Sequence, residues 1–189
     1  MVDAIIAILM SLQPFVSDGE SPTERRARME VISAAIVDAA DRAACFGVWQ
    51  TPDCVPRFRD RRGMAAALIV IGYAESRFAR YVHENRCLDG PPGARCGADD
   101  RGIPRGRSPW QLWRSACPEL WDRMVDSSLE ATQAGAWCSA RLLAGAYRRC
   151  QRKNANPWAG AFSGYRGASC SWPNAANRAR LQRQFVAHL

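Results

Sequence analysis

The sequence has little lysine and little histidine, and it lacks the cysteine spacing of common zinc sites. Lys153 is the only lysine in 189 residues, so the net charge of +8 at pH 7 comes almost entirely from arginine. The two histidines, His83 and His188, lie in no ligand pattern, and no Cys-x-x-Cys occurs. A structural zinc site is therefore not expected, and no metal or other cofactor is implied.

No hydrophobic run is long enough to span a bilayer, so no transmembrane segment is expected. The apolar stretch at residues 1–12 begins like an export signal, but it has no basic start, contains Asp3 and shows no clear cleavage site. We interpret it as an amphipathic or buried first helix. There is thus no clear signal peptide, and export by other means, such as host lysis or packaging, stays open.

No segment alternates apolar and polar side chains as a strand does, and no internal repeat is visible. Helical spacing and start signals, such as the capping box Ser21-Pro22-Thr23-Glu24, recur along the chain. We expect an all-α chain in which residues 1–58 form N-terminal helices packed on a main domain of residues 59–189, most simply as one compact unit. The expected helices cover about 3–13, 22–44, 60–83, 109–115, 118–124, 126–147, 157–164 and 173–187.

The eight cysteines are an even and high number for a chain of this size, which favours disulfides and an oxidising, extracytoplasmic compartment. Buried free thiols are the alternative. Cys45–Cys54 and Cys87–Cys96 are expected to close local loops. Cys117, Cys138, Cys150 and Cys170 then pair among themselves, with Cys150–Cys170 preferred. Residues 84–108, which contain Cys87 and Cys96, are rich in Gly, Pro, Asp and Arg. This composition predicts a long, functional loop.

The positive charge indicates attraction to something anionic, such as nucleic acid, a membrane surface or a bacterial wall. The arginines are scattered along the sequence and form no basic helix stripe or known nucleic-acid-binding motif. Eight cysteines that favour disulfides also fit nucleic-acid binding poorly, so no nucleic-acid partner is expected.

Glu75 lies in the otherwise apolar helical run 64–78. A carboxylate is costly to bury in its charged form, and a carboxylic acid that keeps its proton near neutral pH can act as a general acid. Glu75 is therefore the leading catalytic candidate. The alternative is structural, with Glu75 paired to Arg77, Arg80 or another arginine.

Three motifs stand in order along the chain: Glu75-Ser76-Arg77-Phe78, then Gly106 to Leu112 with Pro109-Trp110-Gln111, then Ala161 to Gly167 with Ser163-Gly164-Tyr165. Together they resemble the lysozyme-like lytic transglycosylases and the related goose-type lysozymes. The resemblance covers roughly residues 60–170 and implies a lysozyme-like helical domain with a long active-site loop.

The resemblance implies a glycosidase that cleaves the β-1,4 bond between N-acetylmuramic acid and N-acetylglucosamine in peptidoglycan strands. Glu75 would protonate the glycosidic oxygen. In the transglycosylase route it then takes a proton from the sugar's own 6-hydroxyl, leaving an anhydro end. Ser76 would orient the site or its backbone, with a plain helix-end hydroxyl as the alternative.

By the same resemblance, Gln111 and Tyr165 face the cleft and hold substrate. Trp110 offers a sugar-stacking face, with core packing as the alternative. The family's asparagine after the tyrosine is replaced here by Arg166. A second register would align Phe162 with the tyrosine and lose its hydroxyl, so we prefer Tyr165.

The loop carries Asp99 and Asp100, and Asp100-Arg101-Gly102 resembles the acidic loop of goose-type lysozymes. An assisting carboxylate there would place a water and make the protein a hydrolytic muramidase; the alternative is a solvated acid. A third reading is an inactive peptidoglycan-binding module of the same fold. The chain is expected to act as a monomer or as part of a larger wall or phage assembly.

Overall fold

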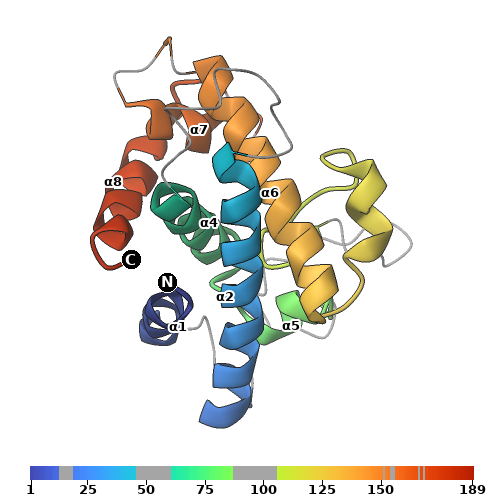
Figure 1. Cartoon of the computed structure of the whole chain (residues 1–189). Coiled ribbons are helices and arrows are strands. Elements are labelled where there is room, and N and C mark those ends of the chain that lie inside the picture. Colours follow the sequence, from blue (N-terminus) through green and yellow to red (C-terminus); the bar gives the residue numbers. More distant parts are fainter. Residues whose placement is uncertain are drawn as a thin grey trace.

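The computed structural model describes residues 1–12, 19–45, 61–86, 106–150, 152–153, 156–165, 167 and 169–189. Within these residues the regular structure is helical and contains no strand, so the all-α prediction is confirmed for this part of the chain. Figure 1 shows the arrangement. The helices are α1 (Val2–Ser11), α2 (Pro22–Cys45), α4 (Arg61–Ser76), α5 (Arg80–His83), the 3-10 helix η2 (Pro118–Arg123), α6 (Leu129–Cys150), α7 (Pro157–Tyr165) and α8 (Ala175–Val186).

Helix α4 runs through the middle of the molecule and packs against α2, α6 and α8 (Figure 1). Residues 64–71 are each at most 1% exposed. A helix that is apolar all round must be covered on all sides, which explains why the other helices gather around α4. Helices α1 and α8 contribute to the same core, which extends from Ile5 to Phe185.

Several predicted helix boundaries are confirmed by the bonds that form them. At the start of α2, the Ser21 amide donates to a Glu24 carboxylate oxygen (2.8 Å), and the Glu24 amide donates to Ser21 Oγ (3.3 Å). Helix α7 starts at Pro157, where Asn156 Oδ1 accepts hydrogen bonds from the two backbone amides of residues 158 and 159. The segment expected at 118–124 is helical, but as a 3-10 helix.

Two helix predictions are wrong. The helix expected over 60–83 is interrupted after Ser76, because Arg77 and Phe78 have φ of 50° and 54° and cannot continue a right-handed helix. The helix expected over 109–115 is instead a tight turn, with φ of 63° at Ser108 and 50° at Gln111. Both departures are set by tertiary contacts described below, which override local helical preference.

Two disulfides are present in the described residues, Cys117–Cys138 and Cys150–Cys170, with Cα–Cα distances of 6.1 and 5.4 Å. The preferred pair Cys150–Cys170 and the pairing left for Cys117 and Cys138 are therefore confirmed. The predicted pairs Cys45–Cys54 and Cys87–Cys96 lie outside the described residues.

In the described part of the chain, no helix combines the length and the apolar character needed to cross a bilayer.

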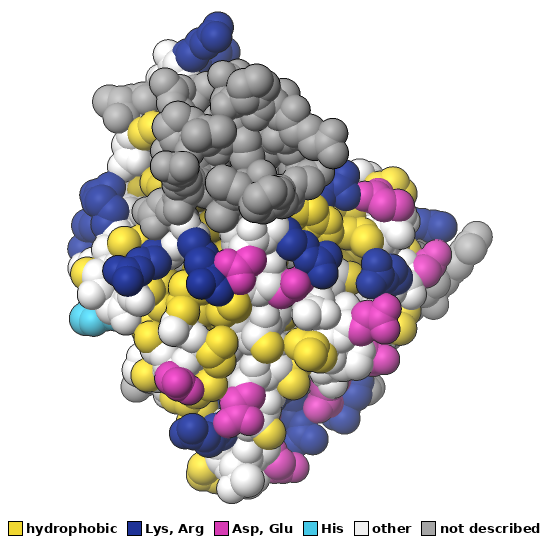
Figure 2. Space-filling model, viewed as in Figure 1, with side chains coloured by type: hydrophobic (Ala, Val, Ile, Leu, Met, Phe, Trp, Pro, Cys, Tyr) yellow, Lys and Arg dark blue, Asp and Glu magenta, His cyan; other side chains and the backbone are white. Residues whose placement is uncertain are grey.

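Charges of both signs are interspersed on the face that α2 forms (Figure 2). Several arginines there are paired with a nearby acid; Arg26 bonds Glu30 at 3.2 Å, and Arg61 bonds Asp41 at 2.7 Å. These exposed pairs contribute little to stability. On this face, the arginines form a mixed surface and not a single basic patch.

His83 ends α5 and is 1% exposed. Its Nε2 lies 2.7 Å from Thr132 Oγ1, which itself donates to the Ser128 carbonyl, so His83 must be the donor through Nε2–H. Nδ1 is buried and has no hydrogen-bond partner among the described residues. Burial, reinforced by the charge of Arg28, lowers the pKa of His83 to about 3.

We predict that His83 makes the fold acid-sensitive. Because its folded pKa lies below the unfolded value of about 6.5, the unfolded chain binds a proton that the folded chain excludes once the pH falls below 6.5. The free energy of unfolding should fall by about 1.4 kcal/mol from pH 8 to pH 5.5 through this group alone. Urea denaturation at both pH values should show that His83→Gln removes this loss, whereas His188→Gln, at the exposed histidine, retains it. Equal pH dependence in native protein and His83→Gln would contradict the assignment.

Candidate functional site

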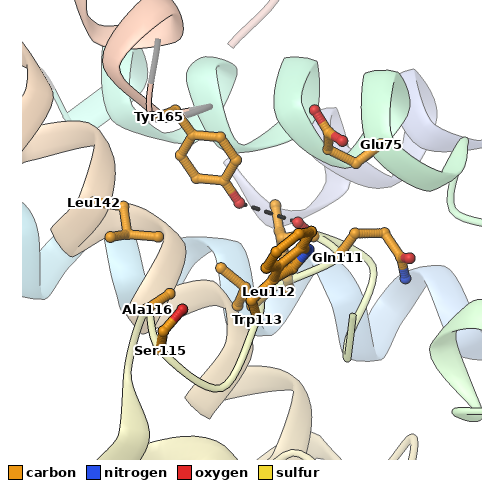
Figure 3. A pocket seen from close by; sticks show the side chains of 10 residues that line it. Glu75, Gln111, Leu112, Trp113, Ser115, Ala116, Leu142 and Tyr165 are labelled. Atoms are coloured by element: carbon orange, nitrogen blue, oxygen red, sulfur yellow. Dashed lines mark hydrogen bonds between the residues drawn. The ribbon is translucent and has the colours of Figure 1, made fainter. Parts of the chain in front are cut away.

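Three segments that are far apart in the sequence line one cleft of about 390 Å³. Glu75 reaches it from the last turn of α4, Tyr165 from the end of α7, and Gln111 from the turn before η2 (Figure 3). These are the residues that the three motifs single out. The remaining lining residues are Trp110, Leu112, Trp113, Ser115, Ala116, Leu142 and Gly167.

The Glu75 side chain is 20% exposed and accepts a hydrogen bond from Arg178 Nη2 at 3.0 Å. Arg178 belongs to α8 and is itself only 12% exposed. The structural alternative, a glutamate paired with an arginine, is therefore present, although its partner is neither Arg77 nor Arg80. Arg178 bonds Oε1, and no residue in the described part of the chain bonds Oε2.

The end of α4 is held by contacts that also place Glu75. Ser76 Oγ donates to the Gly72 carbonyl and accepts from the Phe78 amide, both at 3.0 Å. The Phe78 ring lies directly on Gly72, where an added Cβ would come within 2.3 Å of the ring. Arg28 Nη1 donates to the Phe78 carbonyl at 2.6 Å. Ser76 therefore orients the backbone at the helix end beside Glu75, and it is absent from the cleft lining.

Gln111 is presented by a closed turn. Arg107 and Leu112 exchange two backbone hydrogen bonds of 2.9 Å, and the Gln111 amide donates to the Ser108 carbonyl at 3.0 Å. Ser108 packs into α6 at Gly135, where an added Cβ would come within 2.6 Å of the Ser108 side chain. The turn is therefore fixed on α6, and this docking replaces the helix that the local sequence predicts.

Trp110 anchors the same turn to the core. Its side chain is fully buried, and its indole N–H donates to the Leu68 carbonyl of α4 at 2.9 Å. A buried indole offers no face for a sugar ring. Trp110 therefore packs in the core, as the alternative interpretation expected. The substrate-stacking role predicted for Trp110 is not supported by this placement.

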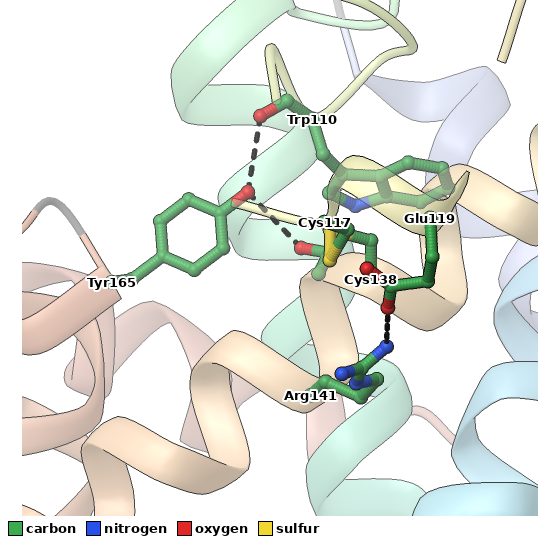
Figure 4. The surroundings of a disulfide bond; sticks show 7 residues. Trp110, Cys117, Glu119, Cys138, Arg141 and Tyr165 are labelled. Atoms are coloured by element: carbon green, nitrogen blue, oxygen red, sulfur yellow. Dashed lines mark hydrogen bonds and ion pairs between the residues drawn. A yellow bond between two sulfur atoms is a disulfide. The ribbon is translucent and has the colours of Figure 1, made fainter. Parts of the chain in front are cut away.

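The Tyr165 hydroxyl joins three walls of the cleft (Figure 4). It donates to the Trp110 carbonyl at 3.0 Å and accepts from Ser139 Oγ of α6 at 3.1 Å. Burial raises the pKa of Tyr165, and the nearby charge of Glu75 raises it further. Tyr165 is therefore a neutral hydroxyl that holds the wall in place. Phe162 of the alternative register is fully buried in the core.

The Cys117–Cys138 disulfide lies beside this network (Figure 4). It links the segment that follows the Gln111 turn to α6, next to Ser139. Glu119 and Arg141 form an ion pair across the same junction. The cleft wall is thus attached to α6 both covalently and through polar contacts.

Two residues of the site have no place in the motifs. Trp113 lines the cleft with 63% of its surface exposed, so it provides the accessible aromatic face that was expected of Trp110. Because Trp113 lies two residues after Gln111, the sequence alone could have suggested that it reaches the same cleft. Arg178 lies 103 positions from Glu75, and no sequence pattern connects the two.

Asp99, Asp100 and Arg166 lie outside the described residues, so the second carboxylate stays a prediction. Among the residues that the structure does describe, no three His, Cys, Asp or Glu side chains gather as a metal site would need.

Comparisons with protein-family models, with curated proteins and with solved structures find no significant match to this chain.

We predict that Gly72→Ala destabilises the end of α4. The new methyl group would overlap the Phe78 ring, which is 1% exposed and has no open space to enter. Overpacking of this kind costs about 1–3 kcal/mol and outweighs the gain of about 1 kcal/mol in helix propensity. The measurement is the free energy of unfolding in urea.

Gly145→Ala in α6 is the matched control, because an added Cβ there meets nothing within 4 Å. This variant should be unchanged or stabilised by up to about 1 kcal/mol. A Gly72→Ala protein as stable as Gly145→Ala would show that Phe78 can move without cost.

Proposed function

We propose that this protein is a peptidoglycan-cleaving glycosidase of lysozyme-like fold, acting outside the cytoplasm, with Glu75 as its acid/base. The observation that carries the proposal is the convergence of Glu75, Gln111 and Tyr165 on one cleft. Random matches to three short motifs have no reason to meet in space. The two disulfides fit a protein that works in an oxidising compartment.

The lining of the cleft suits a glycan. Trp113 supplies an accessible aromatic face, and apolar surface from Leu112, Ala116 and Leu142 surrounds a few polar groups. The Gln111 side-chain carboxamide, whose nitrogen also bonds the Ser108 carbonyl at 3.4 Å, and the Ser115 hydroxyl can bond sugar hydroxyls. Sugar sites commonly combine a flat apolar face for the ring with a small number of polar groups that fix its orientation.

The proposed reaction needs one proton donor at the cleft edge. Glu75 protonates the glycosidic oxygen as the bond breaks through an oxocarbenium-like state, then takes the proton of the 6-hydroxyl as that oxygen closes the anhydro ring. Its Oε2 carries no hydrogen bond to a described residue and is the oxygen available for this exchange. Arg178 holds Oε1 and orients the carboxyl group.

The hydrolytic alternative is a muramidase in which Asp99 or Asp100 positions a water. It gives reducing ends in place of anhydro ends, so the mass of the released fragments distinguishes the two reactions. We favour the transglycosylase because Glu75 is the one carboxylate among the described lining residues of the cleft.

A second candidate function is an inactive peptidoglycan-binding module, and the Glu75–Arg178 ion pair is the observation that favours it. A general acid must hold a proton before it donates one, whereas the guanidinium pairs with the charged carboxylate. In this case the cleft would bind glycan strands and release no fragments.

We predict that Glu75→Gln lowers the rate of wall clearing by about 100-fold or more, the usual effect of losing a general acid. The measurement is loss of turbidity of purified cell walls, followed by mass analysis of the fragments. Glu130→Gln is the control, because Glu130 is 76% exposed and makes only a surface pair with Arg123.

Equal clearing by native protein and Glu75→Gln would remove Glu75 from the reaction. If neither protein clears walls but both sediment with them, the binding module is the correct function. Melting temperatures of the variants show whether a loss of clearing reflects unfolding.

We predict that Trp113→Ala weakens substrate binding while leaving the fold intact. Losing an exposed aromatic platform should raise KM by about two- to tenfold with a small change in kcat. Leu129→Ala, at an exposed apolar residue outside the cleft lining, is the control. An unchanged KM in Trp113→Ala would show that the sugar does not contact this ring.

A further inference from the structure

A second hollow of about 380 Å³ lies between α4 and α8. It shares no lining residue with the Glu75 cleft. The residues that line it are Val70, Tyr73, Ala74 and Arg77 from α4 and its end, and Asn177, Arg178, Arg180 and Leu181 from α8. We refer to it as the α4/α8 groove.

The α4/α8 groove is positively charged. Arg77, Arg178 and Arg180 line it, and its described lining residues include no carboxylate. Arg77 lies over the Tyr73 ring, with 5.7 Å between the guanidinium carbon and the ring centroid. Because guanidinium groups bind carboxylates and phosphates through paired hydrogen bonds, the groove is suited to an anion.

Arg178 connects the groove to the cleft. It lines the groove, while its Nη2 bonds Glu75, which lines the cleft. The guanidinium also lies over the Trp172 ring, 4.9 Å from the centroid. Its Nη1 is buried and has no hydrogen-bond partner among the described residues. A buried donor without a partner is costly, so Nη1 is left with capacity for an acceptor that is not part of the described chain.

We infer that the α4/α8 groove binds a carboxylate-bearing peptide and that Arg178 is shared between this ligand and Glu75. The choice of ligand rests on the proposed function, because peptidoglycan carries short acidic peptides on alternate sugars. A carboxylate of such a peptide would accept from the exposed Arg180, and from Arg178 Nη1 after a side-chain shift uncovers this buried atom.

The apolar part of the lining favours a peptide over a bare inorganic anion. Tyr73 and Leu181 are partly exposed and Ala74 is exposed, so the groove offers apolar contact beside its charges. A phosphate ion would use the arginines and leave this surface uncovered. An acidic peptide can use both the arginines and the apolar surface. Its side chains and backbone can cover the apolar side chains, while its carboxylates bind the guanidinium groups.

The binding test uses the full chain and N-acetylalanylglutamate in calorimetry, with the fully amidated peptide and inorganic phosphate as comparisons. The dicarboxylate should bind at least about tenfold more tightly than the amide, and more tightly than phosphate. Arg180→Gln should weaken it several-fold. Arg183→Gln, at an exposed arginine of the same helix outside the groove, should not.

Equal binding of the acid and the amide, or equal binding by Arg180→Gln and native protein, would overturn the site. Phosphate binding as tight as the peptide would show that the groove recognises only an oxyanion and would overturn the peptide assignment. Neither measurement requires turnover, so both are independent of whether Glu75 is catalytic.

The sharing of Arg178 has its own readout. Removing the charge of Glu75 releases Arg178 from its ion pair, so Glu75→Gln should bind the dicarboxylate peptide several-fold more tightly than native protein. Unchanged affinity would show that Arg178 does not couple the two sites. If Glu75→Gln fails to clear walls but neither protein binds the peptide, the proposed function stands and this inference fails.

Discussion

The buried helix α4 ends at Ser76, and the way it ends decides where Glu75 lies. Had the helix continued to His83 as its sequence suggests, it would have carried Glu75 within an unbroken rod. Two successive residues in the left-handed region cost free energy. Burial of the Phe78 ring on Gly72, two hydrogen bonds of Ser76 and the Arg28 bond to the Phe78 carbonyl offset that cost. The core therefore forces the helix to end after Ser76, and Glu75 lies in its last turn at the edge of the cleft.

The contacts around Glu75 are of two kinds: those that fix the walls of the cleft and the ion pair with Arg178. The Gln111 turn is fixed by Trp110 in the core, and Tyr165 is fixed by two hydrogen bonds, so these walls have one arrangement. Arg178 differs from them, because one of its nitrogens bonds Glu75 and another has capacity for a further acceptor. Under the proposed function, this contact matters most for Glu75, because Arg178 is the one described residue that bonds its carboxylate.

The sequence predicts much of the fold because most helix signals here are local. The capping box at Ser21, the Asn156-Pro157 start and the apolar stripe of α6 each depend on residues within a few positions of one another. The break after Ser76 and the turn at Gln111 depend on contacts with distant helices and could not be read locally. In the same way, the three motifs predicted that Glu75, Gln111 and Tyr165 line one cleft. The contact of Arg178 with Glu75 and the exposure of Trp113 depend on the folded structure and could not be predicted from the motifs.

The Cys117–Cys138 disulfide makes the attachment of one cleft wall depend on oxidising conditions. Residue 138 is followed at once by Ser139, which bonds Tyr165, and Cys117 closes the segment that begins with the Gln111 turn. A newly made chain in a reducing cytosol would have this wall attached by polar contacts and packing alone. Oxidation fastens the wall to α6, so the attachment of this wall depends on the redox conditions in which the chain folds.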